Sequence, residues 1–293
     1  MNKVVQISIL AKISGNVNAD EVVGTRVTLK KMYNTEGEVL PFVSPRAIKY
    51  AIRQALKERG YEIDPFIEEG QQLNDSGDPV RYVDNDLFGY MKTKKGGRKG
   101  EGGSISRQAP IALSYLKAIY DTPISTEFGA RFPRKEDQQD PVPFEIEVAE
   151  FIGKLNAIIY DYVGKKGYNL KEPDFSLDEE ERRKRLRDFL EIFLTPSYVL
   201  PRRSNSLNIP EYISALVMLS YEGPKPIFQY FNYYTEENRI KIKEDQLEQL
   251  KTLLQNTKSE IFLIDYNNAI MPSNFATKKV NESIEKILDF YFE

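Results

Sequence analysis

Hydrophobic and polar residues alternate over residues 4–14, the first patterned stretch of the chain. A valine, three isoleucines and an alanine occupy one side of an extended segment, and glutamine, serines and lysine occupy the other, with Leu10 as the exception. Side chains of a strand alternate between the two faces of a sheet, so the pattern predicts a strand with one buried and one open face. The polar, turn-rich residues 15–37 that follow are expected to form a long excursion or a hairpin.

The period changes to that of a helix over residues 40–59. Ser44 suits an N-cap, and Pro45 suits the first helical position, where its missing N–H costs nothing. Apolar residues fall on one side of this helix, and a stripe of cations without any acidic residue falls on the other. The stripe consists of Arg46, Lys49, Arg53 and Lys57, with Tyr50 beside them. A stripe of one sign suits a polyanion backbone, but an ordinary solvated face fits as well, and the helix alone does not decide between them.

Further patterns predict a mixed α+β chain. We expect helices over 110–120, 177–194, 244–257 and 278–292, and strands over 126–132, 143–149, 212–221 and 260–266. Basic residues surround the 177–194 helix and acidic residues fill its first turn, so pairing within that helix is expected rather than a binding face. The opening order of strand, excursion and helix fits the first half of a ferredoxin-like βαββαβ fold.

Residues 92–107 have the most unusual composition in the chain, with six basic residues, one acidic residue and five glycines. Such a segment cannot pack a core, so we expect a mobile loop. Its spacing matches neither a P-loop nor a dinucleotide-binding turn. The alternatives are a solvated loop and a basic arm on phosphate. We favour the arm, whose candidate contacts are Lys94, Lys95, Arg98 and Arg107.

Composition narrows the chemistry of the 293 residues. The chain has no His and no Cys, which removes imidazole and thiolate from any catalytic or metal site. No cofactor or metal is expected. Neither a membrane-length apolar run nor a signal pattern is present, so we expect a cytoplasmic protein that does not bind membranes.

Charge is distributed unevenly along the chain. The net charge is −3, yet residues 1–62 hold ten Lys and Arg against six Asp and Glu, and residues 222–293 hold nine against twelve. A basic front and an acidic back suit a protein that binds an anion on one side.

Several of these segments together resemble one protein family. The 4–14 strand, the NVNAD excursion, the SPRAIKYAIR helix, DLFGYM at 86–91 and LPRRSNSLNIP at 200–210 are similar to the DevR/autoregulator group of CRISPR repeat-associated proteins. This group supplies the backbone subunit of type I Cascade complexes. The resemblance covers most of residues 1–222, and the sequence departs from the family pattern at Pro45 and Tyr50.

The resemblance implies an RRM-like palm, inserted fingers and a thumb-like hairpin. We assign the palm to 1–62 and 122–222, the fingers with the basic loop to 63–121, and a C-terminal extension packed on the palm to 223–293. It also implies RNA-backbone contacts. Carried onto this chain, they are Ser44, Arg46, Lys49 and Arg53, together with Asn18, Arg202 and Arg203.

The implied function is that of a non-catalytic subunit that polymerises along a guide RNA (crRNA), which then pairs with target DNA in antiviral defence. The implied partners are further copies in a head-to-tail filament, the large, guide-handle-binding and small Cascade subunits, and a recruited helicase-nuclease. One alternative is an RNA-cleaving type III-like subunit, for which Asp20 is the candidate residue. Another is a transcriptional autoregulator, although no helix-turn-helix motif stands out.

Overall fold

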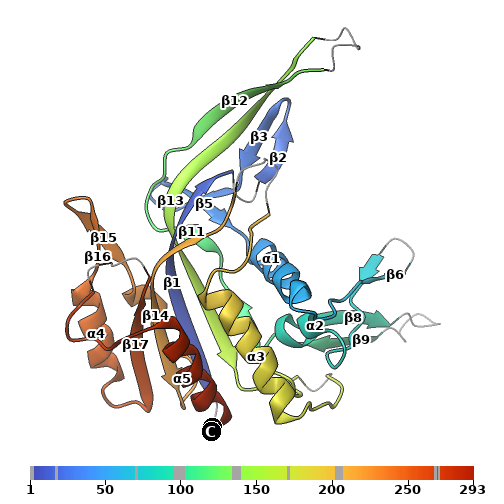
Figure 1. Cartoon of the computed structure of the whole chain (residues 1–293), viewed down its shortest axis with the longest axis vertical. Coiled ribbons are helices and arrows are strands. Elements are labelled where there is room, and N and C mark those ends of the chain that lie inside the picture. Colours follow the sequence, from blue (N-terminus) through green and yellow to red (C-terminus); the bar gives the residue numbers. More distant parts are fainter. Residues whose placement is uncertain are drawn as a thin grey trace.

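A large mixed sheet organises the molecule (Figure 1). The computed structural model describes residues 3–16, 19–69, 72–94, 103–133, 140–169, 172–201, 207–266, 269 and 271–293. The main path of the sheet runs β18-β17-β14-β1-β13-β11-β5-β4. These strands are β1 (Val4–Gly15), β4 (Lys31–Tyr33), β5 (Val39–Val43), β11 (Leu116–Ala118), β13 (Val142–Tyr160), β14 (Glu211–Ser220), β17 (Ser259–Asp265) and β18 (Thr277–Lys278). The α+β class predicted from the sequence is confirmed.

Four strands and two helices form the centre of this arrangement. β1 lies between β13 and β14 and is antiparallel to both, while β11 and the short β10 (Ile111–Leu113) pair antiparallel with β13. Along the chain, helix α1 (Pro45–Glu58) lies between β1 and β11, and helix α3 (Glu179–Leu194) lies between β13 and β14. This connectivity is compatible with the predicted ferredoxin-like palm.

The first strand is buried on both faces, which corrects the prediction of an open face. Gln6 and Ser8 are almost inaccessible to solvent. The side-chain amide of Gln6 donates to the Lys225 carbonyl and accepts from the Lys225 N–H, and the Ser8 hydroxyl donates to Asn156 Oδ1. Both polar side chains are therefore satisfied inside the protein, as buried polar groups must be.

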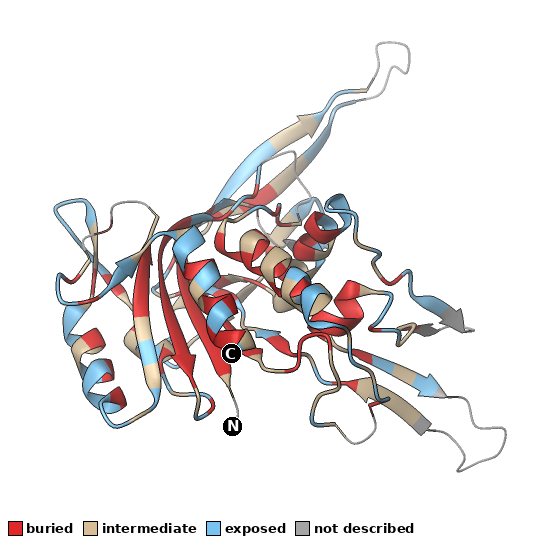
Figure 2. Cartoon of the chain, turned by 60° about the horizontal axis from the view of Figure 1, so that its bottom comes forward, coloured by how far each residue is buried: buried red, intermediate tan, exposed pale blue. Residues whose placement is uncertain are grey.

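The two faces of the sheet carry different helices (Figure 2). Helices α1, α3 and α5 (Val280–Phe292) share one hydrophobic core with the inward residues of β1. Helix α4 (Glu244–Leu254) packs with outward residues of β14 in a second, smaller core on the other face. The C-terminal residues thus extend the same sheet through the pairing of β17 with β14 and add a helix to each face.

Long hairpins project from the sheet. β13 continues beyond it and pairs with β12 (Ser125–Arg131), while β3 (Arg26–Leu29), paired with β2 (Ala19–Val23), lies beside its base. On another side are the hairpins of β6 (Ile67–Glu69) with β7 (Gln72–Asn74) and of β8 (Tyr90–Lys94) with β9 (Gly103–Arg107), next to α2 (Val83–Phe88). A further hairpin joins β15 (Tyr233–Glu236) to β16 (Arg239–Ile242) after the 3-10 turn at Phe228–Tyr230.

Two predictions of local structure are wrong. Residues 110–120 form β10 and β11 rather than a helix, because Leu116 and Ala118 point into the core while their neighbours point away from it. Both strands join the large sheet, although the sequence assigned them to the insertion. The 92–107 segment is not a loop throughout, since its two ends are the paired strands β8 and β9.

No helix among the described residues is both long and apolar enough to cross a membrane.

Candidate nucleic-acid interface

Helix α1 begins as the sequence predicts. Ser44 is the N-cap, and its hydroxyl accepts a hydrogen bond of 3.3 Å from the Ala47 N–H, with Pro45 at the first helical position. Five apolar residues between Ile48 and Leu56 are buried beneath the helix. At either end of the stripe, Arg46 and Lys57 are exposed, and their side chains form no hydrogen bond or ion pair with any described residue. Their charges are free to meet an anion.

The middle of the stripe is partly buried, unlike a solvated helix face. Phe88 of α2 lies under it, with its ring centre 5.3 Å from Lys49 Nζ and 5.4 Å from the Arg53 guanidinium carbon. Arg53 Nε also donates to Asp84 Oδ2 at 2.8 Å, and this carboxylate is 3% exposed. Arg53 is therefore already neutralised by Asp84, and its main role in this structure is to join α1 to α2.

Lys49 differs from Arg53 because it has no acidic partner among the described residues. Burial, and then the neighbouring charge of Arg53, lower the pKa of Lys49 to about 8. Contact with the face of Phe88 offsets only part of this cost. A desolvated ammonium without a counter-ion is the kind of perturbed group that gathers at functional sites.

A cavity of about 640 Å³ adjoins the C-terminal half of the stripe. Tyr50 and Phe66, on opposite elements of its lining, are 54% and 43% exposed. Lys57 contributes an unpaired cation to the same cavity, whereas Arg53 is paired with Asp84 and Arg81 with Glu62, which also lines it. Aromatic surfaces next to cations are what single-stranded nucleic acid needs for base stacking and phosphate binding.

Arg107 is placed where it cannot meet an RNA backbone. Its side chain is fully buried and forms ion pairs with Asp86 and Glu172, while further hydrogen bonds go to the carbonyls of Asp86, Tyr162 and Lys165. Arg185 from α3 reaches the other oxygen of Asp86 at 3.1 Å. We therefore remove Arg107 from the candidate interface, since it anchors the β8–β9 hairpin to α2 and to the segment that follows β13.

Five candidate residues lie outside the described residues, namely Asn18, Lys95, Arg98, Arg202 and Arg203, and the same holds for the side chains of Lys94 and Asp20. Described residues close in sequence to Asn18 and to Arg203 do contact each other. Asn208 Nδ2 donates to the Asn16 carbonyl at 3.3 Å, and Asn16 Nδ2 donates to the Glu147 carbonyl at 2.7 Å. The excursion after β1 and the loop before β14 are thus neighbours, as a shared site requires.

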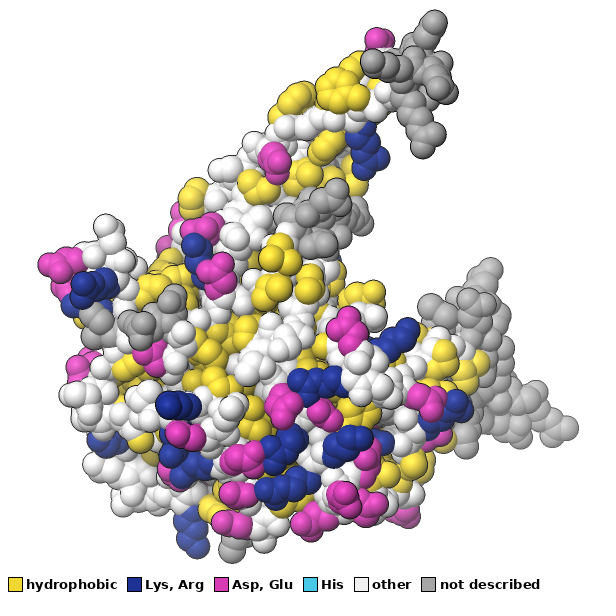
Figure 3. Space-filling model, viewed as in Figure 1, with side chains coloured by type: hydrophobic (Ala, Val, Ile, Leu, Met, Phe, Trp, Pro, Cys, Tyr) yellow, Lys and Arg dark blue, Asp and Glu magenta, His cyan; other side chains and the backbone are white. Residues whose placement is uncertain are grey.

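Three cations of the basic run of α3 are neutralised, one by pairing within the helix as predicted and two by carboxylates of α5. Arg185 pairs with Glu181 one turn earlier, Arg183 with Asp289 of α5, and Arg187 with Glu285 of α5. Figure 3 shows cations and carboxylates interleaved over the lower part of this view. This surface has no free cationic stripe.

The β12–β13 projection is instead apolar over much of its length (Figure 3). Phe128 is 71% exposed, Phe132 78% and Val142 60%. Figure 1 shows α1 between this projection and the β6–β7 and β8–β9 hairpins. Large exposed apolar side chains gathered on one element mark an interaction surface.

The sequence identified the basic stripe of α1 but not the aromatic ring on which its central cations lie. Phe88 belongs to the DLFGYM segment noted in the sequence, yet only the packing of α2 on α1 reveals that it lies under Lys49 and Arg53. Across the described ranges, no cluster of three or more metal-ligating side chains is present.

Comparison with known proteins places the chain in a family. Residues 10–239 match the family model described as "CRISPR-associated negative auto-regulator DevR/Csa2", and the chain belongs to this family. This confirms the resemblance seen in the sequence.

Solved structures support the same fold. One chain described as "CRISPR RNA-guided surveillance complex, pre-nicking" has a TM-score of 0.62 at 12% identity, over 99% of this chain and all of that one. A second, described as "CRISPR RNA-guided surveillance complex", has a TM-score of 0.58 at 12% identity with the same coverage. No curated protein matches the chain.

Proposed function

We propose that the protein is a non-catalytic backbone subunit of a type I Cascade complex in the cytoplasm. Several copies polymerise along one guide RNA and hold its sugar–phosphate backbone, leaving the bases to pair with target DNA. The other Cascade subunits named from the sequence, and a recruited helicase-nuclease, complete the assembly. Family membership supports this role, as does the occurrence of the fold in RNA-guided surveillance complexes.

One observation carries the proposal, namely the unneutralised charge on α1. Arg46 and Lys57 are exposed without a partner among the described residues, and Lys49 keeps a desolvated ammonium between them. A phosphate backbone would neutralise all three. Phosphate contacts carry no sequence information, as a subunit that accepts many guide sequences requires.

Polymerisation is supported by the apolar projection. Phe128, Phe132 and Val142 would be costly to leave in water on a monomer, and a neighbouring copy on the same RNA would cover them. A heterologous contact of this kind does not close on itself, so it extends as far as the RNA allows.

Arg46→Ala tests the role of α1 directly. The exposed side chain has no partner among the described residues, so its loss should leave the melting temperature unchanged. Affinity for single-stranded RNA should fall by a similar factor for every sequence. The plot of log affinity against log salt should flatten by about 0.7 if one phosphate contact is lost.

The matched control is Lys258→Ala, which removes an exposed lysine between α4 and β17, away from α1. Its RNA affinity and salt slope should equal those of the unmodified protein. If Arg46→Ala and Lys258→Ala behave alike, the stripe is only a solvated face.

A further inference from the structure

A pocket of about 580 Å³ opens on the sheet face that α1 does not cover. Lys154 and Asn156 of β13 line it, and they alternate with Leu155 and Ala157, which lie in the core beneath α1 and α3. Side chains of one strand alternate between faces, so the pocket lies opposite α1. Its volume falls within the range of about 300–1,000 Å³ that is common for small-molecule sites.

Two lysines lie side by side on neighbouring strands that line this pocket. Lys117 of β11 is the direct cross-strand partner of Lys154, and like charges in that position destabilise a sheet. None of the lining residues is acidic. A pair of cations held together in this way needs an anion that the protein itself does not supply.

Both ammonium groups keep donors that an anion could use. Lys154 Nζ is fixed by hydrogen bonds to the Phe228 carbonyl at 2.9 Å and to Asn232 Oδ1 at 2.6 Å, which leaves one donor. Lys117 is exposed, and its side chain forms no hydrogen bond or ion pair within the described part of the chain. Burial, and then the charge of Lys117, lower the pKa of Lys154 to about 8.

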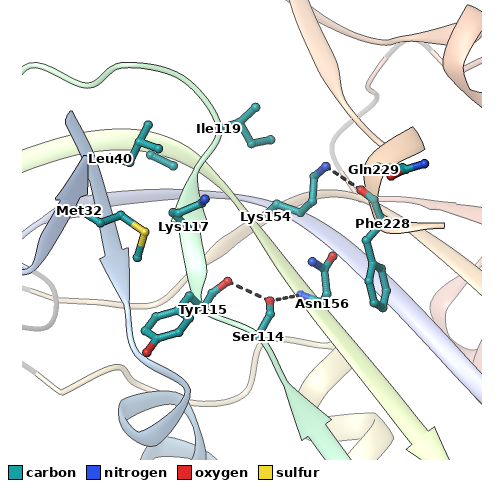
Figure 4. A pocket seen from close by; sticks show the side chains of 11 residues that line it. Met32, Leu40, Ser114, Tyr115, Lys117, Ile119, Lys154, Asn156, Phe228 and Gln229 are labelled. Carbon is teal, nitrogen blue, oxygen red and sulfur yellow. Dashed lines mark hydrogen bonds between the residues drawn. The ribbon is translucent and has the colours of Figure 1, made fainter. Parts of the chain in front are cut away.

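Aromatic rings stand at the two ends of the pocket (Figure 4). Tyr115 is 49% exposed, and its ring is held edge-on against Phe42 with centroids 5.1 Å apart. Phe228 lies at the other end, and the two lysines project between the rings (Figure 4). A flat ring beside a cation pair is suited to a base attached to a phosphate, since base–aromatic stacking is worth about 1–3 kcal/mol.

We propose that this pocket binds a phosphorylated nucleoside, with its phosphate on Lys117 and Lys154 and its base against the exposed ring of Tyr115. The site is separate from α1 and does not depend on the role proposed for that helix. The nucleotide has two possible sources: a free mononucleotide, or one residue of a single strand that passes over this face.

Calorimetric titration with AMP, adenosine and inorganic phosphate tests the proposal. AMP should bind the unmodified protein at least tenfold more tightly than either adenosine or phosphate. Lys117→Ala and Tyr115→Ala should each weaken AMP binding about tenfold, because each removes one of its two attachments. Lys117→Arg keeps the charge and should restore most of the affinity.

Lys258→Ala is the matched control, because it removes an exposed lysine that does not line the pocket. It should leave AMP binding unchanged, and thermal melts should show every variant folded. Absence of AMP binding to the unmodified protein would overturn the proposal. So would equal affinity for AMP and adenosine, or an unchanged affinity in Lys117→Ala.

Binding of single-stranded RNA to the same variants then shows whether the nucleotide is free or part of a strand. If Lys117→Ala weakens RNA binding as well as AMP binding, the pocket takes a nucleotide of a strand; if it weakens only AMP binding, the ligand is free. Arg46→Ala should weaken RNA and spare AMP. Failure of the α1 proposal and failure of the pocket are therefore distinguishable.

Discussion

At the scale of single residues, Lys49 combines a cost in stability with a proposed role in binding. Its ammonium is largely buried beside Arg53 and over Phe88, without an acidic partner among the described residues. A site prepared for an anion is expected to be strained while the anion is absent, because binding groups are retained for function at the expense of stability.

Lys49→Met should therefore stabilise the protein and weaken RNA binding. Each pKa unit corresponds to about 1.4 kcal/mol, so after discounting for residual solvation we expect a gain on the order of 1–3 kcal/mol in the free energy of unfolding at pH 7. Urea denaturation measures this gain. A less stable variant would mean that Lys49 supports the fold instead.

The pH dependence of stability provides a second readout of Lys49. Its pKa of about 8 in the folded state lies below the ordinary lysine pKa of 10.5, so the unfolded state binds more protons between these pH values. The contribution of Lys49 to stability therefore rises as the pH increases through this window. The same rise should be smaller in Lys49→Met.

Burial of these residues was not visible in the sequence. Helical periodicity placed Lys49 and Arg53 opposite the core and predicted two exposed cations. The structure differs because α2, which follows about thirty residues later, brings Phe88 and Asp84 against that side. Hydrophobic periodicity shows which face of a helix packs on the core. It does not show whether a second element packs on the opposite, polar face.

At the scale of elements, the β8–β9 hairpin is held by charge rather than by apolar packing alone. Arg107 at its end pairs with Asp86 and Glu172, and Arg185 joins the same group from α3. Breaking a buried ion pair leaves a charge without compensation and is strongly destabilising.

Arg107→Met should lower the free energy of unfolding by about 3–5 kcal/mol. The control is Arg81→Ala, which removes an exposed pair with Glu62 and should leave the free energy of unfolding nearly unchanged. Chemical denaturation of the two variants gives the comparison. If Arg107→Met melts normally and instead flattens the salt dependence of RNA binding, Arg107 is an RNA contact after all.

Elements with strong local signals were predicted well, and those fixed by distant partners were not. Helix α1 carries its own cap and apolar face, so its boundaries followed from the sequence. Residues 110–120 became strands because β5 and β13 offered open edges to them. The opposition of Lys117 and Lys154 likewise depends on sheet register between distant segments, which neither segment encodes alone.

At the scale of the whole molecule, the proposed binding and assembly surfaces are separate. Cations of α1 lie at the centre, and exposed aromatic residues lie on the β12–β13 projection. The RNA would hold each copy through the first surface, and a neighbouring copy would cover the second. Residues 222–293 carry a small excess of acidic residues and residues 1–62 an excess of basic ones, which also favours contact between unlike sides of successive copies.

Replacing the two exposed phenylalanines separates binding from assembly. Phe128→Ser with Phe132→Ser should preserve binding of one copy to a short RNA, because α1 is untouched. The same variant should fail to add further copies on long RNA, because the apolar contact between copies is lost.

The central claim is tested most directly by the mass of the complex on RNAs of increasing length. Light scattering with unrelated sequences should show mass rising in equal steps, one protein per fixed increment of RNA, with the same step for every sequence. The Phe128→Ser/Phe132→Ser variant should not follow these steps. A fixed stoichiometry, such as a dimer at every length, would contradict the account.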